Sequence, residues 1–385
     1  SGSTLIRGGR VVVEQGVSQQ DLLIRGDEIV GMGELTGAQA DWVFEAGGLL
    51  VLPGAVATHV HFNDVFMGTV SVHDNFTGTL AAAFGGTTSV VDFSNQVPGG
   101  SLAKTLEDKH REAAGKALLD FGVHPVITRP DDETLAEIAT VVDRGAPTIK
   151  CYMTYREDGL LIEDPDLIRI AHRLKDAGGM LMLHAEDNDT IEANRPLLLA
   201  RGDTAPIFHA RSKPPEVETK AIRRIIGMAR ETGARFFIVH LASSGGLDLL
   251  TKAMADGVDI RPETCTHYLV FTEAMLERDD GIKWICSPPL RDERTQAVLW
   301  EGVADGRIRM VTSDDAAYSW EAKLYGKDRF DLCPNGIPGI EPRFQILFSE
   351  AVSYTHLTLP TTWSRCSSRG WRCAWGGGGG GGGGG

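Results

Sequence analysis

Two histidines one residue apart, His59 and His61, follow an apolar run that ends in Pro53-Gly54. Alternation along a strand places residues i and i+2 on the same side, so the two imidazoles are expected to project from one face. Neutral imidazole is the commonest protein ligand for zinc and related metals. The pair therefore suggests half of a metal site, and this hypothesis needs partners with the same geometry further along the chain.

Later apolar runs also end in residues that could bind a metal: Lys150 in 148–152, His184 after 180–183, His240 after 235–239 and Asp314 after 308–311. Together with the first pair, five runs supply four histidines, a lysine and an aspartate. A single histidine at a strand end is more often a hydrogen-bonded core residue. That explanation would have to hold at every position at once, so the whole set indicates a metal centre.

Lys150 requires chemistry of its own, because a protonated lysine among imidazoles would repel a cation. Addition of carbon dioxide to the neutral amine would give a carbamate, an anionic ligand whose two oxygens can bridge two metal ions. Burial lowers the pKa of a lysine and would supply the neutral amine. Two metal ions close together would share a water and lower its pKa. We therefore expect two divalent metal ions, zinc in particular, and N6-carboxylysine at Lys150.

The elements that must position these residues follow a repeating order from Val56 onward. Apolar runs alternate with amphipathic helical patterns, and eight such runs occur, at 56–60, 87–93, 121–127, 148–152, 180–183, 235–239, 259–264 and 308–311. Most are continuously apolar, as strands covered by helices on both faces should be. The order predicts a TIM-type (β/α)8 barrel, an α/β fold in which catalytic groups stand at the carboxyl ends of the strands.

The remaining segments differ in pattern from the barrel, which is assigned to residues 53–352. Residues 1–52 alternate short β-type runs with Gly-rich turns, which predicts part of a small β-sandwich-like domain. Residues 353–385 lose all periodicity and end in Gly376 to Gly385. We interpret this tail as an aberrant low-complexity artefact and exclude it from fold reasoning. The expected fold is therefore truncated at its C-terminus.

Composition excludes several classes of partner. The chain has 385 residues and a formal net charge of -14 at pH 7, without long blocks of one sign, so neither nucleic acid nor an anionic membrane is expected to bind. No apolar run approaches the length of a membrane span, and no signal peptide precedes the first strand. Six cysteines occur without paired spacing, which indicates neither a disulfide framework nor a cysteine zinc site. A cytoplasmic protein is expected.

The metal-binding set resembles that of the binuclear-metal cyclic amidohydrolases. Further motifs are similar to those of the hydantoinase and dihydropyrimidinase branch of that family, namely Phe66–Thr69, Gly85–Thr88, Asp92-Phe93, Tyr152–Tyr155, Glu263–Cys265, Cys286–Arg291 and Pro334–Glu341. The similarity extends from the first strands to about Val352. The resemblance implies hydrolytic opening of a cyclic amide or diamide, such as a hydantoin or a dihydropyrimidine, to an N-carbamoyl amino acid.

The resemblance also implies a division of the metal ligands. His59, His61 and Asp314 would hold one ion, and His184 and His240 the other, with carbamylated Lys150 between them. Asp314 would carry a proton from the attacking water to the leaving ring nitrogen.

The same resemblance implies roles for three residues that face the substrate. Tyr155 would donate a hydrogen bond to the oxyanion of the tetrahedral intermediate. The main chain near Ser287 and Asn335 would bind the amide edge of the ring. A small cyclic amide is then the only partner besides further copies of the chain, as a homodimer or homotetramer.

Three positions depart from the family pattern or leave alternatives open. Ala57 stands where the family carries an aspartate that orients the first histidine pair, so we expect an orienting carboxylate to be missing. The expected C-terminal truncation in addition predicts that the chain binds metal weakly or folds poorly. Asp315 is an alternative to Asp314 as the ligand. Asn63 replaces the arginine of dihydroorotases, which disfavours that activity. An allantoinase-like hydrolase of cyclic ureides and a non-catalytic, dihydropyrimidinase-related structural protein remain as alternative functions.

Overall fold

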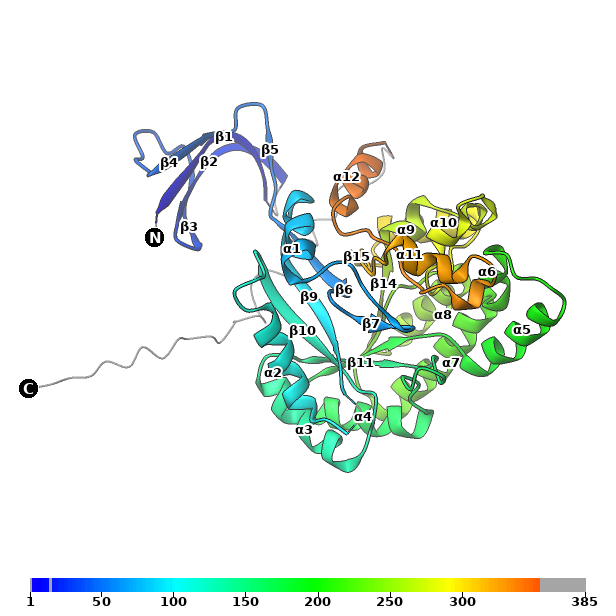
Figure 1. Ribbon diagram of the computed structural model, residues 1–385. Helices are drawn as coiled ribbons and strands as arrows, with labels where there is room; N and C mark the ends of the chain where they lie inside the picture. Colours follow the sequence, from blue (N-terminus) through cyan, green and yellow to red (C-terminus); the bar gives the residue numbers. More distant parts are fainter. Residues whose placement is uncertain (1, 14–15, 98, 354–385) are drawn as a thin grey trace, which may run out of the picture. The chain divides into compact units, whose positions relative to one another are not determined.

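In the computed structural model, the described residues are 2–13, 16–97 and 99–353 (Figure 1). Nearly all of the predicted aberrant tail, residues 353–385, lies outside them. The chain divides after Gly54 into two compact units, the second beginning at Ala55. Each unit has its own sheet.

The first unit contains a five-stranded sheet with the order β3-β2-β1-β4, and β5 also pairs with β1. Its strands are β1 (Ser3–Val13), β2 (Gly16–Arg25), β3 (Glu28–Gly33), β4 (Trp42–Glu45) and β5 (Leu50–Val51). The first three strands pair antiparallel, whereas β4 and β5 run parallel to β1. Leu5, Val11, Leu22 and Ala46 are its buried apolar residues.

The second unit is built on eight parallel strands that neighbour one another in chain order. They are β6 (Ala55–Val60), β9 (Thr87–Asn95), β10 (Asp120–Val126), β11 (Thr148–Tyr152), β12 (Met180–His184), β13 (Phe236–Ile238), β14 (Ile260–Cys265) and β15 (Met310–Thr312). Val60 and Asp315 form a parallel bridge between the first and last strands, and the His61 N–H donates to the Asp315 carbonyl at 2.9 Å. The strands therefore form a nearly closed barrel, and the predicted (β/α)8 fold is confirmed.

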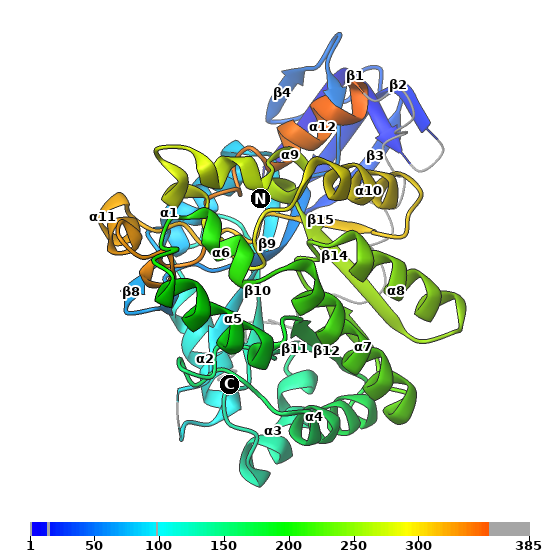
Figure 2. The same ribbon diagram turned by 90° about the vertical axis from the view of Figure 1, so that its right-hand side faces the viewer.

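Helices connect successive strands and lie around the outside of the barrel (Figures 1 and 2). The main ones are α1 (Asn75–Phe84), α2 (Leu102–Ala113), α3 (Asp132–Asp143), α4 (Asp164–Asp176), α7 (Pro215–Thr232), α8 (Ser244–Ala255), α10 (Glu293–Ala304) and α12 (Arg343–Ser353). Local sequence fixes where several begin, since Asp74, Ser101 and Asp131 accept hydrogen bonds from free N–H groups of the first turn. No helix in the described part of the chain is long and apolar enough to cross a membrane.

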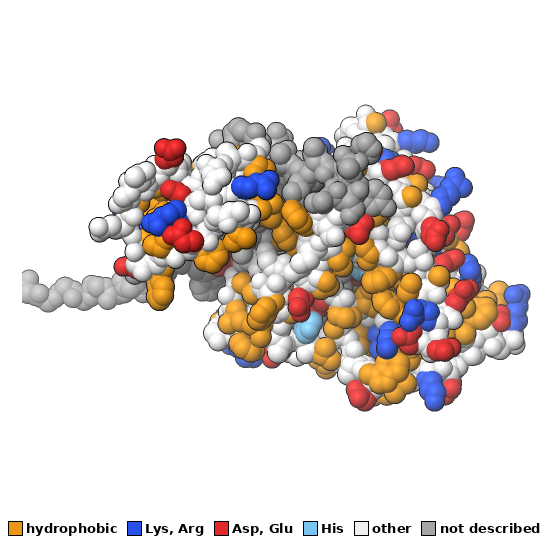
Figure 3. Space-filling model, turned by 90° about the horizontal axis from the view of Figure 1, so that it is seen from above, with side chains coloured by type: hydrophobic (Ala, Val, Ile, Leu, Met, Phe, Trp, Pro, Cys, Tyr) orange, Lys and Arg blue, Asp and Glu red, His pale blue; other side chains and the backbone are white. Residues whose placement is uncertain are grey.

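Further elements lie between the strands and these helices. They are the hairpin β7 (Val65–Phe66) and β8 (Thr69–Val70), the helix α5 (Asn188–Ala200) and the short helices α6 (Ile207–Ser212), α9 (Thr266–Val270) and α11 (Trp320–Lys323). Acidic and basic side chains are interspersed over the face of the larger unit seen in Figure 3. That mixture agrees with the absence of long single-sign blocks in the sequence.

One buried cation ties the last helix to the seam of the barrel. Arg343, at the start of α12, is 1% exposed. Its Nη1 donates to the carbonyls of Val56 and Val311, at 3.1 and 3.0 Å, and its Nη2 donates to Thr87 Oγ1 at 3.1 Å. These bonds join β6, β9 and β15, where the first and last strands meet. Burial lowers the pKa of Arg343 to about 10, a value at which it stays charged at neutral pH.

Candidate metal centre

The first histidine pair and Asp314 point three acceptor atoms at one another. His59 Nε2 lies 3.2 Å from His61 Nε2 and 3.0 Å from Asp314 Oδ1, and His61 Nε2 lies 3.4 Å from the same oxygen. Four ligands around a zinc ion, with bonds of about 2.0–2.1 Å, are separated by about 3.3 Å. The triangle therefore has the size that a tetrahedral zinc site needs.

Lys150, His184 and His240 surround the same cavity, which is also lined by His61 and Asp314. Ligand atoms of His59, His240 and Asp314 lie within 4.8 Å of one another. The rings of His184 and His240 are 4.5 Å apart between centroids. The structure thus brings together all six predicted metal-binding side chains at the carboxyl ends of their strands.

Two buried nitrogens at this cavity have no hydrogen-bond partner, Lys150 Nζ and His240 Nδ1. Lys150 is fully buried, and its Nζ lies over the rings of Phe93 and Tyr152, at 4.8 and 4.9 Å from their centroids. An unpaired buried amine is costly unless something else binds it. The donor set and these unpaired atoms fit a two-metal site with a group bridging at Lys150.

Carboxylates hold the outer nitrogens of three of the histidines. His59 Nδ1 donates to Glu263 Oε1 at 2.5 Å, and His61 Nδ1 donates to Asp64 Oδ2 at 2.9 Å. His184 Nε2 donates to Glu186 Oε2 at 2.7 Å. Such partners fix the tautomer and the orientation of a metal-binding imidazole.

The expectation drawn from Ala57, that the first pair lacks an orienting carboxylate, is therefore wrong. Glu263 comes from β14, which is separated from the strand of His59 by β15, and no local spacing could connect the two. Asp64 follows His61 by three residues, and Glu186 follows His184 by two. Those two spacings were visible in the sequence and could have suggested the contacts.

The electrostatics of the site favour a bound cation. Burial opposes a charge on His61, but hydrogen bonds to Asp314 and Asp64 outweigh it and raise the pKa of His61 to about 9. Burial lowers the pKa of His184 to about 4, and it lowers the pKa of Lys150 to about 8, partly offset by Asp314 and Glu263. Burial also opposes ionisation of Asp314, but the neighbouring histidines hold its pKa well below the ordinary value. His184 and Asp314 therefore already have the forms that bind metal, a neutral imidazole and a carboxylate, whereas His61 must release a proton as a metal ion takes its place.

The two adjacent aspartates have separate environments. Asp314 faces the histidines, whereas the Asp315 carboxylate accepts from the N–H groups of Gly339 and Ile340, at 2.7 and 3.1 Å. His73 Nδ1 donates to its other oxygen at 2.7 Å. Asp315 is fully buried, and its hydrogen bonds stabilise the loop after β15. The structure therefore places Asp314, rather than Asp315, beside the histidines that could hold a metal ion.

Backbone conformation directs site residues into the mouth of the barrel. His240 and Asp314 follow β13 and β15 with φ of 39° and 47°, and Tyr155 has a φ of 65°. The left-handed region is unfavourable for residues other than glycine and persists where the surroundings enforce it. Its use at three residues of one site indicates that the turns are held for the position of these side chains.

The predicted substrate-facing residues Tyr155, Ser287 and Asn335 line the same cavity. The Tyr155 hydroxyl is hydrogen-bonded to the side chains of Ser287 and Asn335, and burial raises its pKa well above the ordinary value, so it keeps its proton. Its ring lies 5.0 Å from that of Phe66 and 5.3 Å from that of His184, measured between centroids. A phenol donor therefore stands between the metal ligands and the aromatic wall of the cavity.

Comparison with known proteins gives relatives over most of the chain, although no protein-family model matches it. D-phenylhydantoinase of Escherichia coli K12 is 39% identical over 359 residues, which cover 92% of this chain and 77% of the relative. D-hydantoinase of Geobacillus stearothermophilus is 35% identical, covering 92% and 76%. The crystal structure of dihydropyrimidinase from Brevibacillus agri superposes with a TM-score of 0.90 at 36% identity, covering 94% of this chain and 79% of that one. The chain belongs to the hydantoinase and dihydropyrimidinase branch of the cyclic amidohydrolases.

Proposed function

We propose that this protein is a metal-dependent hydrolase that opens the ring of a cyclic amide or diamide, a hydantoin or a dihydropyrimidine, to give an N-carbamoyl amino acid. The observation that carries the proposal is the triangle of His59 Nε2, His61 Nε2 and Asp314 Oδ1, with sides of 3.0–3.4 Å. Three acceptor atoms at these separations favour binding of a cation. Relatives at 35–39% identity are named hydantoinases.

We further propose that the centre holds two divalent ions, zinc in particular. His59, His61 and Asp314 would bind one, His184 and His240 the other, and Lys150 would bridge them as N6-carboxylysine. When bound, the ions supply an activated water and polarise the carbonyl that is attacked. The lowered pKa of Lys150, about 8, supports carbamylation, because an appreciable fraction of its amine is neutral near pH 7 and open to carbon dioxide.

The chain's own residues would perform the remaining steps. Tyr155 would donate its phenol hydrogen to the carbonyl oxygen as negative charge develops there, which stabilises the transition state more than the ground state. Asp314 would accept the proton of the attacking water and return it to the ring nitrogen, whose bond to the carbonyl carbon then breaks. The main chain at Ser287 and Asn335 would hold the amide edge of the ring in position for attack.

The cavity wall favours this substrate class over the alternatives. Phe66, Tyr152, Leu160 and Tyr318 line it, which suits an apolar or aromatic ring substituent better than the polar ureido group of allantoin. A purely structural barrel would have no need for unpaired buried nitrogens at Lys150 and His240. Both observations support a hydrolase of apolar-substituted cyclic amides.

Metal analysis combined with turnover tests the proposal. Purified protein is assayed for bound zinc, and hydantoin, dihydrouracil and allantoin are offered separately while N-carbamoyl products are quantified. About two zinc ions per chain with turnover of hydantoin or dihydrouracil are expected. Two bound ions without turnover of any of the three would reject the enzymatic function. Lys150→Ala should lose zinc and activity, and added short carboxylic acids should restore both; unchanged metal content would reject the carbamate.

We also propose a cytoplasmic homodimer or homotetramer. The four cysteines in the described residues, Cys151, Cys265, Cys286 and Cys333, are free and buried, which is usual for reducing compartments. Light scattering coupled to size-exclusion chromatography would give the number of subunits, and a monomeric mass would contradict the assembly.

A further inference from the structure

A buried ammonium group lies between the metal histidines and the substrate-facing side chains. It belongs to Lys213, which directly follows α6 and is 5% exposed. Its Nζ donates to Glu186 Oε2 and to Ser287 Oγ, both at 2.8 Å. The Glu186 carboxylate is in turn hydrogen-bonded to His184, and the Ser287 hydroxyl to Tyr155. One cation therefore contacts the partners of a metal histidine and of a substrate-facing side chain.

On one side, Lys213 acts on a metal ligand through Glu186. The same oxygen, Glu186 Oε2, also accepts from His184 Nε2 at 2.7 Å. An oxygen that accepts from a lysine ammonium at 2.8 Å is a carboxylate oxygen without a hydrogen of its own, so it can only accept from the imidazole as well. His184 must therefore carry its hydrogen on Nε2. The lone pair on Nδ1 is then free for a metal ion.

On the other side, Lys213 sets the direction of a hydrogen bond at Tyr155. A lysine ammonium has no acceptor, so Ser287 Oγ accepts from it and must place its own hydrogen elsewhere. The Tyr155 hydroxyl is hydrogen-bonded to Ser287, and its ring lies 5.2 Å from Nζ, measured to the centroid. Ser287 therefore donates to the Tyr155 oxygen, and the phenol hydrogen is left to point at a third group in the cavity.

We propose that Lys213 is a positioning residue for the ring-opening reaction. It fixes the tautomer of His184 through Glu186 and the donor direction of Tyr155 through Ser287. The role assigned to Tyr155 rests on the proposed function, whereas the role assigned to His184 concerns metal binding alone. A lysine that only neutralised a buried carboxylate would affect stability without changing the catalytic constants of the folded protein.

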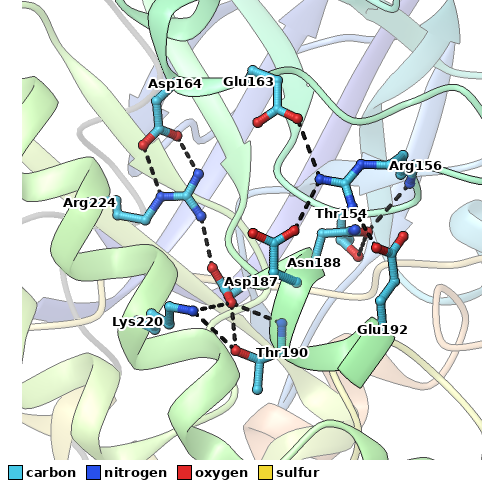
Figure 4. Close-up of polar contacts among 11 residues, drawn as sticks. Thr154, Arg156, Glu163, Asp164, Asp187, Asn188, Thr190, Glu192, Lys220 and Arg224 are labelled. Atoms are coloured by element: carbon cyan, nitrogen blue, oxygen red, sulfur yellow. Dashed lines mark hydrogen bonds and ion pairs between the residues drawn. The ribbon is translucent and has the colours of Figure 1, made fainter. Parts of the chain in front are cut away.

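The test compares Lys213→Met and Lys213→Arg with a matched control, Lys220→Met. Lys220 Nζ donates to Asp187 Oδ1 at 2.7 Å, one residue beyond Glu186. Asp187 keeps Arg224 as a second partner at 2.9 Å, in the surface network of Figure 4. The control thus removes an ammonium from the neighbouring carboxylate without touching Glu186.

Three quantities are measured: zinc affinity by competition with a chelator, kcat and KM for hydantoin or dihydrouracil, and the unfolding midpoint. Lys213→Met is expected to weaken zinc binding and to lower kcat by about 10–100-fold each, the usual loss for a group that orients a metal ligand. KM should change little, since the Tyr155 bond acts in the transition state. Lys213→Arg keeps donors and charge and should restore kcat to within about threefold; Lys220→Met should match the wild type.

A folded Lys213→Met protein with wild-type zinc affinity and kcat would overturn the proposal. So would a Lys213→Arg protein as slow as Lys213→Met, because packing alone would then explain the loss. If Lys213→Met does not fold, the double variant Lys213→Met, Glu186→Gln removes the unpaired buried charge. It should fold and stay slow, and wild-type kcat would refute the role. If the wild type binds zinc but opens no cyclic amide, the proposed function fails. The zinc affinities of the variants would still show whether Lys213 orients His184.

Discussion

Replacing Glu263 by glutamine keeps the shape of the side chain that orients His59 and removes its charge. The two groups are 2.5 Å apart and both side chains are fully buried, so water cannot take the place of the carboxylate. A hydrogen bond to a charged group contributes about 1.5–3 kcal/mol, against about 0.5–1.5 kcal/mol for a neutral one. The difference of about 1–1.5 kcal/mol corresponds to roughly 5–12-fold in metal affinity.

Asp64→Asn is the matched comparison for Glu263→Gln. Asp64 orients His61 at 2.9 Å, but its side chain is 15% exposed, so water can compensate for the lost charge. We expect a loss of less than about threefold in zinc affinity for this variant, below the usual effect of orienting partners, about 10–100-fold. A weakening of about fivefold or more should be specific to Glu263→Gln, as worked out above.

The assay titrates metal-free protein with zinc in the presence of a competing chelator and checks the end point by elemental analysis. Unfolding midpoints of both variants establish that the comparison is between folded proteins. Wild-type zinc affinity in Glu263→Gln, or an equal loss in Asp64→Asn, would refute the view that a fully buried, charged partner from another strand replaces the carboxylate absent at Ala57.

Three further predictions separate the roles of neighbouring groups. Asp315→Ala leaves buried N–H groups without an acceptor and should lower the free energy of unfolding by about 2–4 kcal/mol. Asp314→Asn, by contrast, should fold normally and lose about 10²–10⁴-fold in kcat. Denaturant melts and initial rates would show the opposite pattern if the assignment of the two aspartates were reversed. Tyr155→Phe should lower kcat by about 10²–10³-fold with little change in KM, and steady-state kinetics showing a loss confined to KM would contradict its role at the oxyanion. Burial raises the pKa of Glu218 to about 7, above the unfolded value near 4.5, so its stabilising contribution is present below pH 4.5 and is lost as pH rises through 7. Relative to Glu218→Gln, the wild type should lose about 3 kcal/mol over that interval, and parallel urea midpoints of the two proteins between pH 4.5 and 8 would exclude the effect.

The barrel, and the meeting of the candidate metal-binding side chains at its mouth, could be predicted because each depends on local pattern. A continuous apolar run indicates a covered parallel strand, and the carboxyl ends of all such strands meet at one mouth. His59, His184 and Asp314 could therefore be grouped without any knowledge of distances. The structure confirms that all eight runs are strands of one nearly closed barrel.

The contacts behind that set could not be predicted in the same way. Glu263 lies 204 residues from His59 along the chain, and Lys213 follows a short helix that carries no catalytic pattern. The left-handed backbone at His240 and Asp314 also depends on tertiary surroundings, since neither residue type requires it. Ala57 does not leave His59 without an orienting carboxylate, because Glu263 on another strand supplies one.

The seam of the barrel, closed by Val60 with Asp315 and by Arg343 with Val56, has a consequence for how the protein is made. The Arg343 contact joins residues 287 positions apart, so ribosomal synthesis at about 5–20 residues per second separates the two partners by tens of seconds. Until the last strand emerges, the growing sheet has two open edges, which can pair with other chains. During that interval His59 and His61 have been synthesised but Asp314 has not. If His59, His61 and Asp314 hold one ion as proposed, that ion binds only after the ring is complete, and nascent chains that stall before residue 314 should be aggregation-prone and free of metal at this site.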